Sequence, residues 1–268
     1  MIRRLLALAL LACPAALRAQ GDAPADPVPA HDTLTVTSRA LGEPRRINVH
    51  VPPGYAASAA RFPVLYMPDG GVDEDFPHVV NTVDSLAAAG AIRPVIVVGI
   101  PNTERRRDLT GPTRVARDST IAPHVGGSAR FRAFVRDELR PAIDARYRTT
   151  SERAIVGESL AGLFVVETFL LDPTSFDHFV AFDPSLWWNG GALVDSAPAR
   201  LAAMPVGRRT LFLASSRDGI DERSTRLASM LRAATPSGLT WVYMPQPSLT
   251  HATIFRAVAP SALAAALR

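Results

Sequence analysis

A serine among small residues gives the clearest sign of chemistry in this sequence. Ser159 stands in the run IVGESLAG, residues 155–162, between an apolar segment and the apolar, helix-like stretch 160–171. A sharp strand-to-helix turn exposes a serine oxygen at a helix N-terminus, where the backbone dipole stabilises negative charge. Ala161 stands where the G-x-S-x-G pattern has its second glycine, and Gly162 follows it. We predict a nucleophile at Ser159 rather than a small-residue turn that happens to contain serine.

A nucleophilic serine needs a base, and the position of His251 in the chain fits that role. In proteins with this turn the order along the chain is serine, acid, histidine. His178 also follows Ser159, but it precedes the predicted strand 179–182 and therefore belongs to the far edge of a sheet. His251 lies in a loop that leads into the last predicted helix. From there its ring could take the serine proton.

Four acidic residues compete for the third position of a catalytic triad. We favour Asp218, because it follows the predicted strand 210–214, where the orienting carboxylate usually stands. Asp221 and Glu222 lie close to it, and either could instead place negative charge at the start of the next helix. Asp183, at the end of the preceding strand, is the fourth candidate.

Backbone amides and aromatic rings could complete the site. The loop PDGG, residues 68–71, follows a buried strand, so the Gly71 amide could join the Leu160 amide in stabilising an oxyanion. Gly70 and the pair Trp187 and Trp188 are candidates for substrate contacts, since indoles stack on flat groups, although core packing would suit the tryptophans equally well. The histidines lack metal-ligand spacing, and no glycine-rich phosphate loop opens a helix. We therefore expect no metal and no cofactor.

The elements that must position these residues alternate between extended and helical patterns. Such alternation after a hairpin predicts an α/β fold of the α/β-hydrolase type, with a mostly parallel central sheet, helices on both faces and an N-terminal antiparallel hairpin. Ligands bind at the carboxyl ends of the strands in such sheets, where Ser159 falls. The expected strands are 33–38, 45–51, 62–67, 94–100, 154–156, 179–182, 210–214 and 239–244, and the expected helices include 76–89, 127–147 and 160–171.

Composition excludes several classes of protein. The chain has 268 residues, 47% hydrophobic residues and one cysteine, which argues against a disordered tail and against a disulfide framework. Residues 1–19 have the pattern of a signal peptide, with Arg3 and Arg4 before an apolar run and Ala19 before the expected cut. Cleavage would leave 26 arginines of the 29 basic residues against 25 acidic ones, because three arginines leave with the signal. We therefore expect no nucleic-acid partner.

The N-terminal pattern also sets the expected location and domain organisation. We expect a signal peptide over 1–19, a disordered linker over 20–30 and one α/β-hydrolase domain over 31–268, in a periplasmic or secreted protein. The apolar run is too short for a stable membrane span. Cys13 would fit a lipoprotein cleavage box, but Pro14 directly after it makes us favour ordinary cleavage.

Several runs together resemble a known family. These runs are LYMPDG at 65–70, VVGI at 97–100 with RDLT at 107–110, GESLAG at 157–162 and DPSLWW at 183–188. They resemble the putative esterase family of the α/β-hydrolases, which includes enterochelin-esterase-like enzymes, feruloyl esterases and S-formylglutathione hydrolase. By that resemblance, Ser159 looks like the nucleophile, His251 the base, and Gly71 with Leu160 the oxyanion donors. The chain departs from the family pattern at Ala161 and carries Asp183 where serine is more usual.

These features together predict an exported serine esterase that acts on small-molecule carboxylic esters. Ser159, His251 and Asp218 would form and hydrolyse an acyl-enzyme. Three alternatives stay open at this point. They are an acyltransferase on the same scaffold, a siderophore lactone hydrolase and a binding module without catalytic activity.

Overall fold

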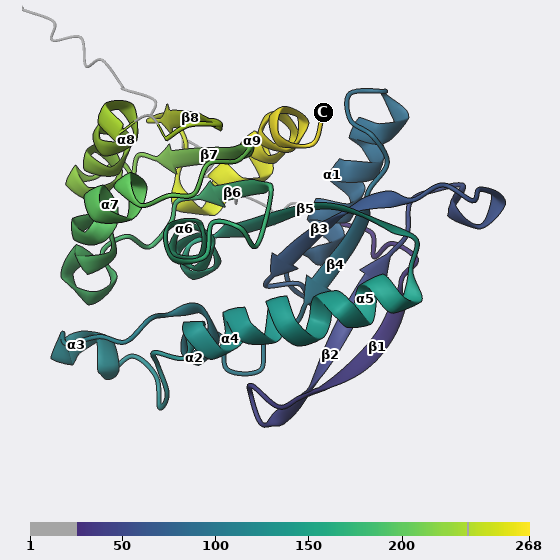
Figure 1. Ribbon diagram of the computed structural model, residues 1–268, viewed down its shortest axis with the longest axis horizontal. Coiled ribbons are helices and arrows are strands. Elements are labelled where there is room, and N and C mark those ends of the chain that lie inside the picture. Colours follow the sequence, from purple (N-terminus) through teal and green to yellow (C-terminus); the bar gives the residue numbers. More distant parts are fainter. Residues whose placement is uncertain (1–25, 235) are drawn as a thin grey trace, which may run out of the picture.

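An eight-stranded sheet runs through the molecule in the order β1-β2-β4-β3-β5-β6-β7-β8 (Figure 1). The computed structural model describes residues 26–234 and 236–268. β1 pairs with β2 and β2 with β4 in antiparallel fashion, whereas all later pairs are parallel. The strands are β1 (Asp32–Ser38), β2 (Glu43–His50), β3 (Phe62–Pro68), β4 (Ile96–Ile100), β5 (Thr149–Glu158), β6 (His178–Phe182), β7 (Arg209–Ser216) and β8 (Leu239–Gln246).

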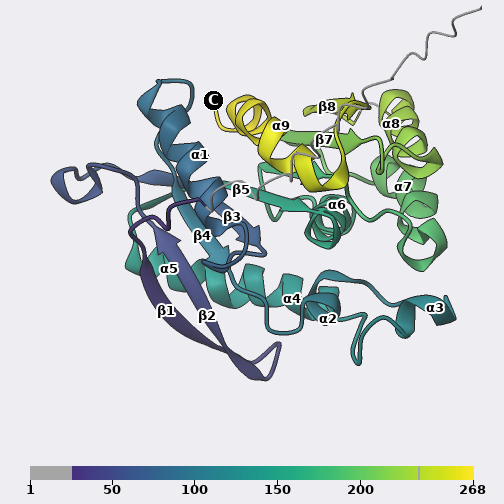
Figure 2. The same ribbon diagram turned by 180° about the vertical axis from the view of Figure 1, so that it is seen from behind.

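Helices cover both faces of this sheet, which confirms the predicted α/β-hydrolase class. α1 and α9 pack on one face and share one apolar cluster, with α9 in front of the sheet in Figure 2. α4, α5, α6, α7 and α8 share the cluster on the other face. The α-helices are α1 (Phe76–Ala88), α2 (Arg105–Leu109), α3 (Ala116–Ser119), α4 (Ser128–Phe134), α5 (Arg140–Arg146), α6 (Leu160–Leu171), α7 (Ala192–Ala202), α8 (Glu222–Ala234) and α9 (His251–Ala266). Single turns of other types are η1 (Tyr55–Ala57), η2 (Val135–Leu139) and η3 (Trp188–Gly191).

The helix expected over 127–147 forms, but with a wider segment at its centre. α4 and α5 are joined by η2, which is a π-helical turn. Pro141 lies just beyond this turn and has no N–H to donate, and a proline ring crowds the carbonyl four residues before it. A π turn is a common way for a helix to accommodate such a defect without ending.

The segment between β4 and α4 contains two short helices, α2 and α3, that the sequence analysis did not predict. Its outer part is fixed to the turn η3 by long-range hydrogen bonds. The Arg114 N–H donates to Asn189 Oδ1 (2.8 Å), and the Asn189 N–H donates to Asp118 Oδ2 (2.8 Å). The Trp188 indole N–H donates to the Gly111 carbonyl (2.8 Å). These contacts, rather than a periodic apolar pattern, give the segment its shape.

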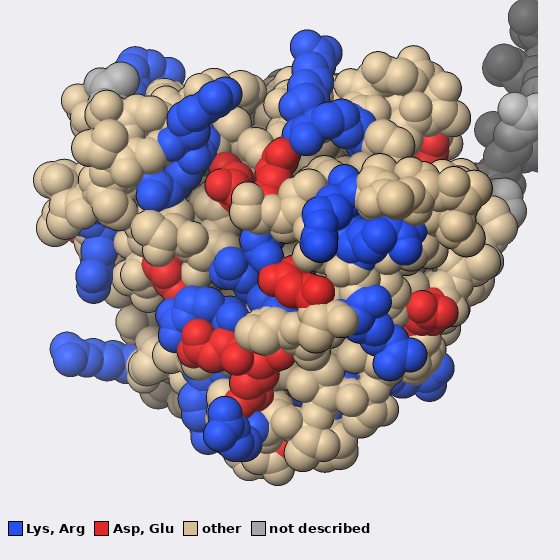
Figure 3. All heavy atoms as spheres, turned by 45° about the vertical axis from the view of Figure 1, so that its right-hand side comes forward, with Lys and Arg blue, Asp and Glu red and all other residues tan. Residues whose placement is uncertain are grey.

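The N-terminal segment and the surface charge were also subjects of the sequence analysis. The predicted signal peptide, with Cys13, lies outside the described residues, and residues 26–30 of the predicted linker have no regular secondary structure. No helix in the described part of the chain is both long and apolar enough to cross a membrane. On the face drawn in Figure 3, arginine and acidic side chains are interspersed and do not form one continuous basic field.

Candidate active site

Three neighbouring strands end in residues with a positive φ. Asp69 follows β3 with φ 54°, Ser159 follows β5 with φ 58°, and Asp183 follows β6 with φ 39°. A non-glycine residue at positive φ costs about 1–3 kcal/mol in folding free energy, so it persists only where the surrounding structure fixes it. Such residues cluster at functional sites. In the described residues, Asn189 is the one other non-glycine residue with this backbone conformation. Backbone strain therefore lies mainly at the carboxyl edge of β3, β5 and β6.

Ser159 occupies the sharp turn that the sequence predicts. It separates β5 from α6 and has φ 58° and ψ −116°. Its N–H donates to the Phe182 carbonyl on β6 (3.0 Å), and its carbonyl accepts from the Leu163 N–H in the first turn of α6 (2.8 Å). α6 is buried on every side except at its last residue, Leu171. The hydroxyl is thus held at the N-terminus of a buried helix, where the helix dipole favours negative charge.

The small residues around Ser159 are required by close packing of backbones. A Cβ atom at Gly157 would lie 2.7 Å from the Ala161 backbone, and a Cβ atom at Gly162 would lie 2.9 Å from the Phe182 carbonyl oxygen. Ala161 itself is fully buried with its methyl group against Gly157. The methyl group at 161 therefore fits, because Gly162 provides the close approach to β6.

The carboxylate beside the His251 ring belongs to Asp183, not to Asp218, which the sequence analysis favoured. His251 Nδ1 lies 3.1 Å from Asp183 Oδ2. The Asp183 side chain is 1% exposed and also accepts hydrogen bonds from the Ser216 N–H (2.6 Å) and the Ser216 hydroxyl (2.5 Å). Asp218 Oδ2 instead accepts from the backbone N–H of His251 (2.8 Å). Asp183 therefore orients the ring, and Asp218 holds the main chain at the start of α9.

The remaining candidates for the acid lie at the start of α8. Asp221 Oδ1 accepts from the Ser224 N–H (2.8 Å), which is the role of a helix N-terminal carboxylate. Glu222 is the first residue of α8. Neither side chain has a hydrogen bond to the His251 ring within the described residues.

Gly219 makes room for the Asp183 carboxylate, a role that the sequence analysis missed. A Cβ atom at this position would lie 2.2 Å from Asp183 Oδ1 and 2.8 Å from Asp183 Cγ. The glycine therefore lets the turn after β7 pass directly over the buried carboxylate. The only sign of this role in the sequence was the dipeptide Asp218-Gly219, which indicates a turn. The glycine of that turn makes room for Asp183 and not for its neighbour Asp218.

The Ser159 hydroxyl and the His251 ring lie at the same edge of the sheet. Ser159 bonds through its main chain to Phe182, the residue before Asp183, and Asp183 contacts the ring. The Ser159 hydroxyl is 3.4 Å from the Ser185 hydroxyl, and no hydrogen bond joins it to the ring among the residues that the structure describes. Hydrogen bonds between nucleophile and base are often long until substrate binds.

Charges near the ring favour its protonated form. The hydrogen bond to Asp183 raises the pKa of His251 most, and the nearby Glu158 carboxylate raises it further. Burial would raise the pKa of Asp183, but hydrogen bonds from His251 and Ser216 outweigh burial and lower it. Burial raises the pKa of Glu158 to about 7, and neighbouring acids, including Asp75, add to this shift. Burial likewise raises the pKa of Asp75 to about 6.

The loop after β3 places its two glycines differently. The Gly70 N–H donates to the Ile100 carbonyl (3.1 Å), and the Gly70 carbonyl accepts from Asn48 Nδ2 (2.9 Å). A Cβ atom at Gly70 would lie 2.2 Å from the Ile100 nitrogen, so this residue serves packing against β4 and its amide is not free for a substrate. The Gly71 N–H donates to the Glu74 carboxylate (2.7 Å). Leu160 opens α6, so its N–H has no acceptor within the helix.

The two tryptophans have different surroundings. Trp188 is 4% exposed and donates to the Gly111 carbonyl, so it belongs to the core and not to a substrate surface. Trp187 is 46% exposed and lines an apolar cavity of about 430 Å³ together with Val115 and Ile121. Trp187 is two residues after Ser185, which lies beside the Ser159 hydroxyl.

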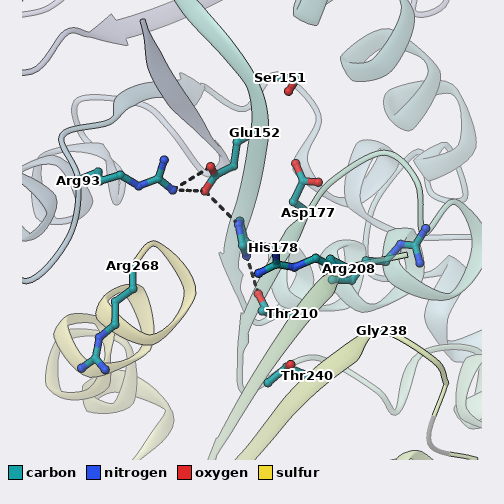
Figure 4. A pocket seen from close by; sticks show the side chains of 11 residues that line it. Arg93, Ser151, Glu152, Asp177, His178, Arg208, Thr210, Gly238, Thr240 and Arg268 are labelled. Carbon is teal, nitrogen blue, oxygen red and sulfur yellow. Dashed lines mark hydrogen bonds and ion pairs between the residues drawn. The ribbon is translucent and has the colours of Figure 1, made fainter. Parts of the chain in front are cut away.

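A second cavity, which is polar and has a volume of about 390 Å³, lies at the opposite edge of the sheet (Figure 4). Arg93 donates two hydrogen bonds to Glu152 (2.6 and 2.8 Å), Glu152 lies 3.2 Å from His178 Nε2, and His178 Nδ1 lies 2.7 Å from the Thr210 hydroxyl. His178 therefore lies at the far edge, as predicted, although it is the first residue of β6 and not the residue before that strand. In the described residues, no three His, Cys, Asp or Glu side chains are arranged to hold a metal ion.

Comparison with known proteins places this geometry in a family. The sheet order, the turn at Ser159 and the helices on both faces define an α/β-hydrolase. The Esterase family model, described as "Putative esterase", matches residues 38–234, and the chain belongs to that family. The resemblance noted in the sequence is thereby confirmed.

Individual relatives are similar over part of their length. The chain is 28% identical over 177 residues to the ferri-bacillibactin esterase BesA of Bacillus subtilis, covering 60% of this chain and 61% of that protein. It is 31% identical over 175 residues to the siderophore triacetylfusarinine C esterase of Aspergillus fumigatus, covering 59% and 57%. The match thus covers less than two thirds of either relative. The crystal structure of an IroE-like serine hydrolase from Shewanella oneidensis superposes with a TM-score of 0.81 at 26% identity, covering 88% of this chain and 79% of that one.

Proposed function

We propose that this protein hydrolyses carboxylic esters through an acyl-enzyme on Ser159. The observation that carries the proposal is the strained turn that presents Ser159 at the N-terminus of α6, at the same edge of the sheet as a histidine held by a buried aspartate. The family supports ester hydrolysis as the reaction.

Each group has a defined role in the proposed reaction. Ser159 Oγ attacks the ester carbonyl carbon, and His251 Nε2 accepts its proton. The buried Asp183 carboxylate holds Nδ1, which fixes the ring orientation and stabilises the imidazolium that forms. The imidazolium then gives its proton to the departing alcohol. In the second half, His251 takes a proton from water and the hydroxide adds to the acyl carbon. The imidazolium then returns that proton to Ser159 Oγ as its bond to the acyl carbon breaks, which releases the acid and restores the enzyme.

Two backbone amides are proposed to stabilise the oxyanion. Leu160 supplies the free N–H at the start of α6, and Gly71 supplies the second from the loop after β3. Removing one such donor typically costs about 10²–10³-fold in kcat. The cavity beside Trp187 is proposed to receive an apolar or aromatic part of the substrate, because its walls include an exposed indole.

Siderophore esters are the second candidate substrate class. Of the two relatives described above, one is named a ferri-bacillibactin esterase and the other a siderophore triacetylfusarinine C esterase, and their similarity to this chain supports the class. We propose to offer the purified protein a catecholate trilactone beside short p-nitrophenyl esters. Faster hydrolysis of the trilactone would favour the siderophore class, whereas hydrolysis of simple esters alone would favour a general esterase.

The nucleophile is tested by labelling and substitution. We expect a fluorophosphonate probe to label the wild type, and Ser159→Ala to lose both the label and about 10⁵-fold or more in kcat. His251→Ala should cause a loss of similar size. A protein that is folded but is neither labelled nor active would support a non-catalytic binding module. Transfer of the acyl group to an added alcohol in preference to water would support an acyltransferase.

We also propose that the protein is exported after cleavage behind Ala19. The mass and N-terminal residue of protein recovered from periplasm and medium would test this. A mature chain that starts at Gln20 is expected. A lipid-modified chain that starts at Cys13 would instead support membrane anchoring.

A further inference from the structure

The amide proposed as an oxyanion donor in the loop after β3 is already occupied. The Gly71 N–H donates to Glu74 Oε2 (2.7 Å), and the Glu74 N–H donates back to the Gly71 carbonyl (3.0 Å). This reciprocal pair closes a tight turn over residues 71–74. A carboxylate is a strong acceptor for a backbone N–H, and one N–H cannot serve two strong acceptors at full strength.

The Glu74 carboxylate is itself held by a second contact. Asn102 Nδ2 donates to Glu74 Oε1 (2.6 Å) and also lies 2.5 Å from Asp69 Oδ1. Arg105 in turn donates two hydrogen bonds to the Asp69 carboxylate (2.7 Å each). The network begins at the strained residue after β3 and ends at the Gly71 amide. It fixes the direction in which that N–H points.

We propose that Glu74 is a positioning residue that holds the Gly71 amide in a resting state, which the reaction must undo. This inference rests on the proposed function, because it takes Gly71 as an oxyanion donor. When Ser159 attacks, negative charge develops on the substrate oxygen, and the Gly71 N–H must leave Glu74 to reach it. A nearby carboxylate also repels that developing charge. Glu74 therefore raises the barrier to acyl transfer and has little effect on the binding of the neutral ester.

The decisive variants change the carboxylate and its partner separately. Glu74→Ala frees the amide, and we expect kcat to rise about five-fold or more, with KM within about two-fold of the wild type. Glu74→Gln keeps an acceptor but removes its charge, so a smaller rise is expected. Asn102→Ala removes the hydrogen bond to Glu74 Oε1 and so leaves the carboxylate less firmly held, and it should also raise kcat. A Cβ atom at Gly71 would lie 2.8 Å from Asp73 Oδ1, so Asp73→Asn removes a charge at a similar distance without touching the Gly71 hydrogen bond. A smaller rise in kcat than in Glu74→Ala is expected, and an equal rise would overturn the role of the hydrogen bond.

A boronic acid that forms a tetrahedral adduct with Ser159 gives a second measure. Its inhibition constant should fall in Glu74→Ala by about the same factor as kcat rises. The reason is that the adduct places a negatively charged oxygen against the same two amides, those of Gly71 and Leu160. A structural role for Glu74 would lower thermal stability and kcat together and would leave the preference for the adduct unchanged.

The outcomes separate this inference from the proposed function. A wild type that a fluorophosphonate labels at Ser159, with kcat unchanged or lower in Glu74→Ala, would overturn the inference alone. If neither the wild type nor Glu74→Ala is labelled or active, the proposed function and the inference both fail. A rise in kcat in Glu74→Ala and Asn102→Ala that Ser159→Ala abolishes would support both. Thermal unfolding of each variant checks that the loop change leaves the fold intact.

Discussion

Each of the two edges of the sheet carries a partly buried glutamate near a histidine, but the two glutamates have opposite pKa shifts. At the amino edge, Glu152 is paired with Arg93 and His178, and these partners outweigh burial and lower its pKa. At the carboxyl edge, burial raises the pKa of Glu158 to about 7, and one of its buried carboxylate oxygens lacks a hydrogen-bond partner. Paired charges stabilise a fold, whereas an unpaired buried acid costs stability and persists where function requires it. The comparison supports the proposal that the active site lies at the carboxyl edge.

The choice of acid gives the largest expected contrast. Asp183→Asn should lower kcat by about 10³-fold or more, because the amide cannot stabilise the imidazolium and can favour the wrong tautomer. Asp218→Asn should lower kcat by less than about ten-fold, because that side chain touches only the main chain of His251. Steady-state kinetics of the two variants decides the matter. A larger loss in Asp218→Asn would return the orienting role to that residue.

A single methyl group should disturb the same edge at a distance from the nucleophile. Gly219→Ala places a Cβ atom 2.2 Å from Asp183 Oδ1, so the carboxylate must move away from the His251 ring. We expect kcat to fall about 10²-fold, since small displacements of a catalytic group are costly. Gly207→Ala is the matched control near the amino edge, where the added atom meets the flexible end of Arg209. An equal effect in both variants would mean that the loss comes from general destabilisation.

The pH dependence of stability should have opposite signs at the two edges, with effects of a few degrees in Tm. The pKa of folded Glu158 is about 7, above the 4.5 of an unperturbed glutamate, so ionised Glu158 destabilises the fold above pH 7. Glu158→Gln should therefore raise Tm at pH 8, and the gain should vanish as pH falls from about 7 towards 4.5. Glu152→Gln should lower Tm at pH 8, and that loss should shrink as pH falls through the lowered pKa of folded Glu152. Calorimetry of both variants at pH 3, 5 and 8 tests the contrast: the Glu158→Gln gain should appear between pH 5 and 8, and the Glu152→Gln loss should shrink only between pH 5 and 3. Changes of equal sign at pH 8 would contradict it.

Local patterns predicted the positions of Ser159 in a strand-to-helix turn and of His251 at the last helix, but not which carboxylate faces the His251 ring. A strand, a small-residue turn and a helix are contiguous in the sequence, and chain order leaves His251 as the one suitable histidine. Asp183 and Asp218 both follow strands at the same edge. Which of them reaches the ring depends on the tight turn at Asp183 and on the lack of a side chain at Gly219, and neither is visible in a list of residue types.

The fold was predictable where periodicity was strong and less so elsewhere. Apolar strands and long amphipathic helices lie where the sequence places them, although β5 begins at Thr149, five residues earlier than the strand expected from Ala154. The first half of β5, residues 149–153 (TTSER), is polar throughout, which concealed it. α2 and α3 are too short for a periodic pattern and depend on contacts made far along the chain, such as those of Asn189. The Glu74 contact had a faint signal, an acid three residues after a loop glycine, which resembles a helix-capping arrangement.

The burial of α6 has a consequence for the ionic conditions under which the protein works. Dissolved ions weaken the field of a helix end most effectively when the helix is bathed in solvent. α6 is enclosed by the sheet and its neighbouring helices, so mobile ions cannot approach its flanks. The field at the Ser159 oxygen should therefore weaken less with added salt than the ion pairs on the protein's exterior do.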